Sequence, residues 1–153
     1  LIGLENNNYY PTKAYDTVAD GTFISEVVKS NKLFFLFDLA HAQVTASNKK
    51  ISFEKYIESL PMDEMLQMHI CRPKIDKKIS RDTHYLPNDK MFREIKMLSN
   101  KYKNLKFFTI EYYKNPEKLI LARSGVSKSA EGFGGRSDSF WLQQTASGRP
   151  GSV

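Results

Sequence analysis

Residues that can bind a metal ion follow four short hydrophobic runs along the chain. Each run leads to a carboxylate or an imidazole, and the four residues concerned are Glu5, Asp38, His69 and Glu111. In parallel α/β folds the carboxyl ends of the strands meet on one face, and that face holds the active site. Residues far apart in the sequence then become neighbours, so we expect these four side chains to meet.

Two local motifs add three further candidates. His41 follows Asp38 in the motif Asp-Leu-Ala-His, and Asp82 lies two residues before His84. In an extended segment, residues two apart point to the same side. The three histidines of the chain all fall in these motifs or at the strand ends. The predicted metal site therefore comprises Glu5, Asp38, His41, His69, Asp82, His84 and Glu111.

The ligand types narrow the choice of metal. Imidazole and carboxylate together suit iron, manganese or zinc, and they do not choose between these metals unaided. Seven candidates exceed the six positions of one octahedral ion, so two or more ions bridged by a carboxylate are the simpler arrangement. Structural roles stay open as well, because a carboxylate at a strand end can cap a helix and a lone histidine can be a hydrogen-bonded core residue.

The hydrophobic runs themselves predict the strands that must position these residues. They cover residues 1–4, 33–37, 65–68 and 107–110, and each is too short for a helix. Continuous rather than alternating hydrophobicity is typical of parallel strands that are covered on both faces.

Amphipathic patterns between the runs predict four helices. The first covers residues 23–28, with Thr22 as its N-cap, and the second covers residues 53–60, with Ser52 as its N-cap. The remaining two are a clear pattern over residues 91–102 and a weaker one over residues 116–121. Strands and helices therefore alternate, which predicts an α/β fold with a parallel sheet and right-handed crossovers.

The spacing of the strand ends indicates a particular α/β architecture. Successive ends are 33 residues apart (from 5 to 38), then 31 (from 38 to 69), then 42 (from 69 to 111). A TIM-type (β/α)₈ barrel of about 250 residues averages about 31 residues per unit. We therefore predict that residues 1–124 form about half of such a barrel, either as a fragment or completed by another chain, with an open sheet as the alternative. Half a barrel leaves two open strand edges, through which the chain could self-associate.

Composition places the chain among ordinary globular proteins and excludes several classes of function. Its 153 residues are 41% hydrophobic and 26% charged, and no apolar run approaches the roughly 18 residues of a membrane span. The net charge is +6, but the lysines are scattered without a basic stripe, so neither nucleic acid nor a membrane is an expected partner. The lone Cys71 excludes an internal disulfide framework and favours a reduced, cytoplasmic setting.

The last part of the chain differs in composition from the rest. Residues 125–153 hold six of the eight glycines and many serines. We interpret them as a flexible tail, which need not be native to the domain.

Taken in order, the candidate motifs resemble a known family. They are Glu5-Asn6-Asn7, Leu36-Phe37-Asp38 with His41, Met68-His69-Ile70, Asp82-Thr83-His84 and Ile110-Glu111. This order is similar to that of the multinuclear non-haem iron-dependent oxidative enzymes, long catalogued as domain of unknown function 692. The resemblance covers residues 1 to about 114, and it implies a xylose-isomerase-like barrel that holds two or three irons.

The resemblance also implies a reaction, partners and roles for the residues. Studied members oxidatively modify cysteine-type residues of ribosomally made precursor peptides, often with a partner protein that presents the peptide. On this sequence, Glu5 resembles the bridging carboxylate, and His41 stands where many members have an asparagine. The residues that resemble the other ligands are Asp38, His69, Asp82, His84 and Glu111.

Two departures from the family pattern bear on activity. Arg72 and Pro73 follow His69 closely, where members usually carry another histidine. The family's earlier histidine and glutamate ligands belong to strands that this chain lacks. The resemblance therefore implies activity for the full-length protein rather than for this isolated polypeptide.

Two other functions remain open from the sequence. The first is a sugar isomerase or phosphodiesterase on a similar barrel, in which zinc or manganese acts as a Lewis acid. The second is a non-enzymatic remnant that binds a partner through its open sheet edges.

Overall fold

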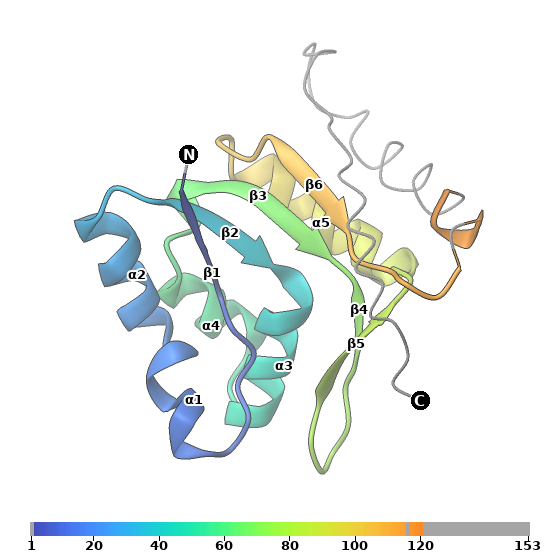
Figure 1. Cartoon of the computed structure of the whole chain (residues 1–153), viewed down its shortest axis with the longest axis horizontal. Coiled ribbons are helices and arrows are strands. Elements are labelled where there is room, and N and C mark those ends of the chain that lie inside the picture. The colour runs from blue at the N-terminus through green and yellow to red at the C-terminus, as the bar shows by residue number, and fades with distance from the viewer. Residues whose placement is uncertain (1, 116, 121–153) are drawn as a thin grey trace, which may run out of the picture.

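A four-stranded parallel sheet forms the centre of the computed structural model, which describes residues 2–115 and 117–120 (Figure 1). The strands lie in the order β1-β2-β3-β6, and a two-stranded antiparallel hairpin, β4-β5, follows β3. Their bounds are Gly3–Glu5 (β1), Phe34–Asp38 (β2), Met65–Ile70 (β3), Arg72–Lys74 (β4), Arg81–Tyr85 (β5) and Phe107–Ile110 (β6). Sequential order and parallel pairing confirm the α/β class and are compatible with part of an α/β barrel.

Helices alternate with the strands of the parallel sheet along the chain. They are α1 (Lys13–Val18), α2 (Gly21–Ser30), α3 (Leu39–Lys49), α4 (Phe53–Ser59) and α5 (Asp89–Lys101), with a short 3₁₀ turn, η1, at Met62–Glu64. Three of the predicted helices are confirmed as α2, α4 and α5. Residues 117–120 of the fourth are helical, while its predicted ends at 116 and 121 lie outside the described residues, as does the predicted tail.

Polar side chains set where these helices begin. Ser52 caps α4 as predicted, since its hydroxyl accepts a hydrogen bond from the backbone N–H of Lys55 at 3.1 Å. The prediction that Thr22 caps α2 is wrong. Asp20 takes that role, its carboxylate accepting from the N–H of Phe23 at 2.8 Å, and Thr22 lies inside the first turn.

The sequence patterns did not predict α3, which connects β2 to the rest of the fold. Its buried face is built largely from alanines, including Ala40, Ala42 and Ala46, so it lacks the stripe of large apolar residues that reveals an amphipathic helix. Asp38 caps it, accepting from the N–H of His41 at 2.7 Å. This cap places His41 in the first turn of the helix, directly beside the end of β2.

The hydrophobic core lies between one face of the sheet and the helices that cover it. Phe35, Phe37, Met68 and Ile70 are fully buried there, whereas alternate residues such as Leu36 remain half-exposed. The second face is covered only in part, since Leu36 is half-exposed there whereas Asp38 and Thr109 are buried. The runs look continuous because the second face also carries hydrophobic side chains. Within the described residues, no helix combines the length and hydrophobicity needed to cross a membrane.

Candidate metal centre

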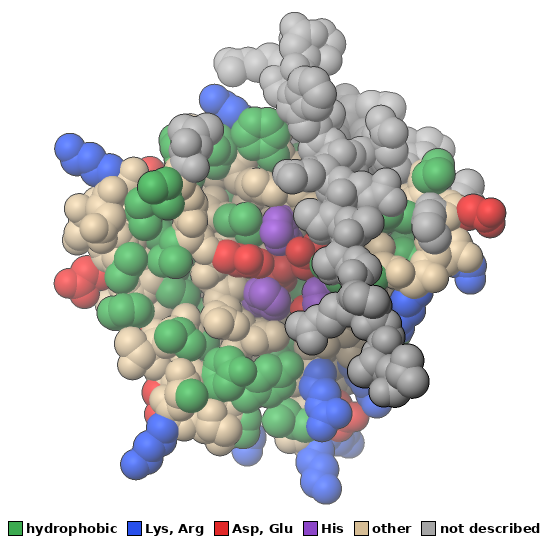
Figure 2. All heavy atoms as spheres, in the orientation of Figure 1, with side chains coloured by type: hydrophobic (Ala, Val, Ile, Leu, Met, Phe, Trp, Pro, Cys, Tyr) green, Lys and Arg blue, Asp and Glu red, His purple; other side chains and the backbone are tan. Residues whose placement is uncertain are grey.

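The carboxyl ends of the parallel strands bring the predicted site residues to one edge of the sheet. Glu5 ends β1, Asp38 ends β2, and the N–H of Glu111 continues the ladder after β6 by donating to Ile70 O at 3.0 Å. Asp38 and His69 are direct partners in the β2–β3 pairing. Figure 2 shows the acidic and histidine side chains gathered near the middle of this face, with lysines and arginines towards its rim.

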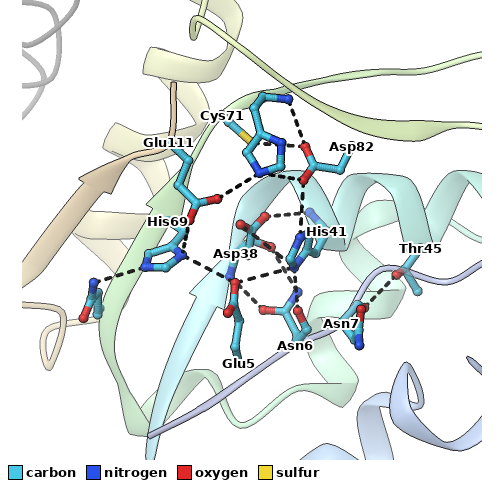
Figure 3. A network of polar contacts seen from close by, with 12 residues as sticks. Glu5, Asn6, Asn7, Asp38, His41, Thr45, His69, Cys71, Asp82 and Glu111 are labelled. Atoms are coloured by element: carbon cyan, nitrogen blue, oxygen red, sulfur yellow. Dashed lines mark hydrogen bonds and ion pairs between the residues drawn. The ribbon is translucent and has the colours of Figure 1, made fainter. Parts of the chain in front are cut away.

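Six of the seven predicted residues form a closed ring of alternating imidazoles and carboxylates (Figure 3). Its order is His41, Glu5, His69, Glu111, His84, Asp82 and back to His41. Glu5 Oε1 lies 3.6 Å from His41 Nδ1 and 3.4 Å from His69 Nδ1, so a single oxygen is shared between two imidazoles.

The other two carboxylates of the ring also each contact two imidazoles, Asp82 through one oxygen and Glu111 through both of its oxygens. Glu111 places Oε1 3.2 Å from His69 Nδ1 and Oε2 3.3 Å from His84 Nε2. Asp82 Oδ2 lies 3.1 Å from His84 Nε2 and 3.5 Å from His41 Nε2. The structure therefore brings together residues spread over more than a hundred positions of sequence, as the strand-end pattern predicts.

Asp38, the seventh residue, lies beneath the ring and is fully buried. One of its oxygens caps α3, but the other, Oδ2, is buried without a hydrogen-bond partner and lies 3.9 Å from His41 Nδ1. An unpaired buried carboxylate oxygen is costly, and a cation is one of the few groups that compensates for it. Together with His69 and Glu111, or with Glu5 and His41, Asp38 forms a group of atoms close enough to hold a metal ion.

The β4-β5 hairpin supplies Asp82 and His84. Both side chains face the ring as predicted, but the strand is not regularly extended, because His84 has a positive φ of 46°. Non-glycine residues seldom adopt such angles, and they do so mainly where the surroundings require it. Here the backbone N–H of His84 donates to Asp82 Oδ1 at 3.2 Å, and this hydrogen bond links the two residues within β5.

Asn6 and Cys71 orient neighbouring side chains, although neither was among the predicted ligands. The Asn6 side chain accepts from Asp38 N–H at 2.8 Å and donates to Asp38 O at 3.0 Å, while its backbone carbonyl lies 2.9 Å from His41 Nδ1. The Cys71 thiol is buried and donates to Asp82 Oδ1 at 3.2 Å. These contacts leave His41 Nε2 and Asp82 Oδ2 facing each other.

Burial and mutual charge shift the pKa values of the cluster in opposite directions. Burial raises the pKa of Asp38 to about 7. Burial opposes protonation of the imidazoles, but the surrounding carboxylates outweigh it and raise the pKa of His41 to about 9 and of His69 to about 10. Burial likewise opposes ionisation of Glu111, yet His69 and His84 hold its pKa well below its usual range. The carboxylates of the cluster therefore favour the protonated, positively charged form of these imidazoles.

These shifts predict how the stability of the metal-free protein depends on pH. Protonated His41 and His69 stabilise the fold fully below about pH 6.5, and this contribution is lost as the pH rises through about 9 and 10. The raised pKa of Asp38 has the reverse effect: its ionisation lowers stability from about pH 3.8 to about pH 7 and changes little above that. We expect the free energy of unfolding, measured in urea, to fall between about pH 7 and pH 10.

Glutamine variants provide the control for this pH dependence. His41→Gln and His69→Gln keep a polar side chain that does not titrate, so each should flatten the decline. If both variants showed the same slope as the wild type, the assignment of the decline to the imidazoles would be wrong.

Comparison with known proteins places the chain in a family. Residues 1–109 match the family described as RiPP precursor modification enzyme MbnB/TglH/ChrH, where RiPP denotes a ribosomally made and subsequently modified peptide. The chain belongs to this family. The match confirms the resemblance found in the sequence motifs.

Relatives of this MbnB/TglH/ChrH-family chain are longer than the segment they share with it. The UPF0276 protein of Caulobacter vibrioides is 31% identical over 84 residues, which are 55% of this chain and 30% of the relative. The UPF0276 protein of Paraburkholderia phytofirmans is 34% identical over 68 residues, or 44% of this chain and 22% of the relative. The chain thus covers less than a third of these curated relatives. No solved structure matches it significantly.

Proposed function

We propose that the MbnB/TglH/ChrH-family protein of which this chain is a part is a metal-dependent oxidative enzyme that modifies a ribosomally made peptide, using two or more iron ions. The observation that supports it most directly is the ring of three imidazoles and three carboxylates around the unpaired Asp38 Oδ2. Membership of a family of peptide-modifying enzymes supports the substrate class.

The donor set fits iron on chemical grounds. Four carboxylates and three imidazoles offer oxygen and nitrogen ligands without an obligatory thiolate, a combination that suits iron, with zinc or manganese as alternatives. The carboxylates of Glu5, Glu111 and Asp82 fit more than one ion, because each carboxylate lies between two imidazoles. The proposed ligands are Glu5, Asp38, His41, His69, Asp82, His84 and Glu111.

The residues of the chain have separable tasks in this proposal. Ferrous iron held by these side chains would supply the redox chemistry with O₂. Carboxylates and imidazoles fix the positions of the ions and neutralise their charge, and the contacts of Asn6 and Cys71 keep the ligand side chains oriented. The hairpin, anchored at its tip where Asn48 accepts from the N–H of Ser80 at 2.8 Å, holds Asp82 and His84 over the strand ends.

The same proposal covers the rest of the protein. The sheet order places β1 and β6 at its two edges, and we propose that further βα units pair with them to complete a TIM-type, xylose-isomerase-like barrel with additional ligands. Without those units the open edges favour self-association. A partner protein that presents the peptide and a cytoplasmic setting complete the proposal.

Metal content and oxygen dependence test the proposed function. The full-length protein, purified without oxygen and loaded with Fe(II), should bind at least two irons per polypeptide. It should change the mass of a cysteine-containing precursor peptide only when both iron and O₂ are present. Mass spectrometry of the peptide provides the measurement, with the zinc-loaded and manganese-loaded proteins as controls.

Two results would contradict the proposal in different ways. Turnover of a sugar or phosphodiester with zinc or manganese, independent of O₂, would favour the isomerase or phosphodiesterase alternative. A full-length protein that binds a peptide but no metal would favour the non-enzymatic alternative.

A further inference from the structure

The side chain of Gln67 contacts the Nε2 edge of the His69 imidazole, which is turned away from the ring of imidazoles and carboxylates. Gln67 precedes His69 by two residues on β3, so the two side chains project from the same face of the sheet. The Gln67 amide nitrogen lies 3.2 Å from His69 Nε2 and 2.8 Å from the hydroxyl of Thr109 on β6. These contacts link the His69 imidazole on β3, through Gln67, to Thr109 on the neighbouring strand β6.

The other imidazole nitrogen of His69, Nδ1, points into the candidate metal centre. Nδ1 is buried and lies between two carboxylates, 3.2 Å from Glu111 Oε1 and 3.4 Å from Glu5 Oε1. These atoms are also close enough to one another to share a cation, since His69, Glu111 and Asp38 form one of the groups that could hold a metal ion. Nδ1 is therefore the nitrogen that His69 offers to a metal.

We propose that Gln67 is a positioning residue of the metal centre, holding His69 through Nε2 so that Nδ1 faces the cation. The inference rests on the proposed function, because it assigns a role around the ion. An imidazole that binds a cation through Nδ1 carries its hydrogen on Nε2, and that hydrogen needs an acceptor. A 180° rotation of the Gln67 amide exchanges its oxygen and nitrogen, and the oxygen then accepts from both His69 Nε2–H and the Thr109 hydroxyl.

His41 shows a related arrangement with its nitrogens exchanged, in which Nδ1 also lies 3.6 Å from Glu5 Oε1. Its Nδ1 lies 2.9 Å from the backbone carbonyl of Asn6, which leaves Nε2 directed at Asp82 Oδ2. In each imidazole one nitrogen is held by an amide group and the other faces a carboxylate. For His69 the amide belongs to a side chain, so it can be removed by substitution.

Substitution of Gln67 in the full-length protein tests the inference. Gln67→Leu removes the acceptor at similar size, whereas Gln67→Glu retains an acceptor of greater strength. Gln43→Leu is the matched control, because Gln43 donates to Glu94 at 2.6 Å on the far side of α3, away from the ring. Fe(II) affinity is measured by anaerobic competition with a chelator, and the visible spectrum of the Co(II)-loaded protein reports the ligand geometry.

The expected result is a loss of affinity specific to the missing acceptor. Gln67→Leu should weaken Fe(II) binding about 10–100-fold and alter the Co(II) spectrum, as is typical of losing a hydrogen-bond partner of a ligand. Gln67→Glu and Gln43→Leu should bind at least as tightly as the wild type. Thermal unfolding of the metal-free variants establishes that each is folded.

Three results would overturn the inference. Wild-type affinity in Gln67→Leu would show that the amide does not act on the metal. Equal weakening in Gln67→Leu and Gln67→Glu would show that packing, and not hydrogen bonding, is responsible. A wild-type protein that binds no metal would overturn the proposed function and this inference with it, whereas the first two results leave the proposed function intact.

Discussion

Replacing Asp82 and His84 together with alanine is expected to remove at least one metal ion from the full-length protein. Asp82 Oδ2 lies within 3.5 Å of two imidazoles, and His84 Nε2 lies within 3.3 Å of two carboxylates, so the double variant opens the ring on the hairpin side. Affinity for the lost ion should fall more than about 100-fold, beyond the 10–100-fold that is typical of losing an outer partner of a ligand. Elemental analysis of the Fe(II)-loaded protein gives the stoichiometry.

The same hairpin offers a control for this result. Thr83 lies between the two residues and donates to Arg72 O at 3.2 Å across the hairpin. Thr83→Ala therefore disturbs β5 without removing a side chain of the ring, and it should leave the iron content unchanged. Equal iron content in the double variant and the wild type would exclude the hairpin residues as ligands and would count heavily against the proposed function.

The strand ends were predictable from the sequence because two independent regularities coincide there. A short hydrophobic run predicts a strand, and parallel pairing forces the ends of such strands to one edge. These two regularities are sufficient to predict that four residues lie close together: Glu5, Asp38, His69 and Glu111. Residues outside the strands are harder to place, since the position of His84 depends on a hairpin and on a positive φ that no periodicity reveals.

The features that the sequence did not reveal are those that depend on tertiary contacts. Alanine packing against the sheet builds α3, and the Asp38 cap was the signal available for it, because an aspartate directly after a strand commonly begins a helix. Cys71 could be placed near the site from its spacing to His69, but its contact with Asp82 depends on how the hairpin folds back. Asn6 lies beyond the hydrophobic run of β1, so no periodicity indicates that its side chain is completely buried.

Asn6 is the residue whose loss should most affect the stability of the fold at this site. It lies just beyond β1, and its side chain replaces the next rung of the β1–β2 ladder by bonding both the N–H and the carbonyl of Asp38. All of these groups are buried. Removing the amide leaves the Asp38 N–H without this acceptor, and an unpaired buried donor costs about 1–3 kcal/mol in addition to the lost hydrogen bonds.

Asn6→Leu is therefore expected to lower the free energy of unfolding by about 2–4 kcal/mol, measured by urea unfolding of the metal-free protein. Asn7→Leu is the matched control: Asn7 is exposed and contributes its backbone carbonyl, not its side chain, to the contact with Thr45. That variant should change stability by no more than about 0.5 kcal/mol. Because Asp38 carries both the cap of α3 and the unpaired Oδ2, Asn6→Leu should also weaken metal binding. Equal stability of the two variants would show that the end of β2 is held in place without the Asn6 amide.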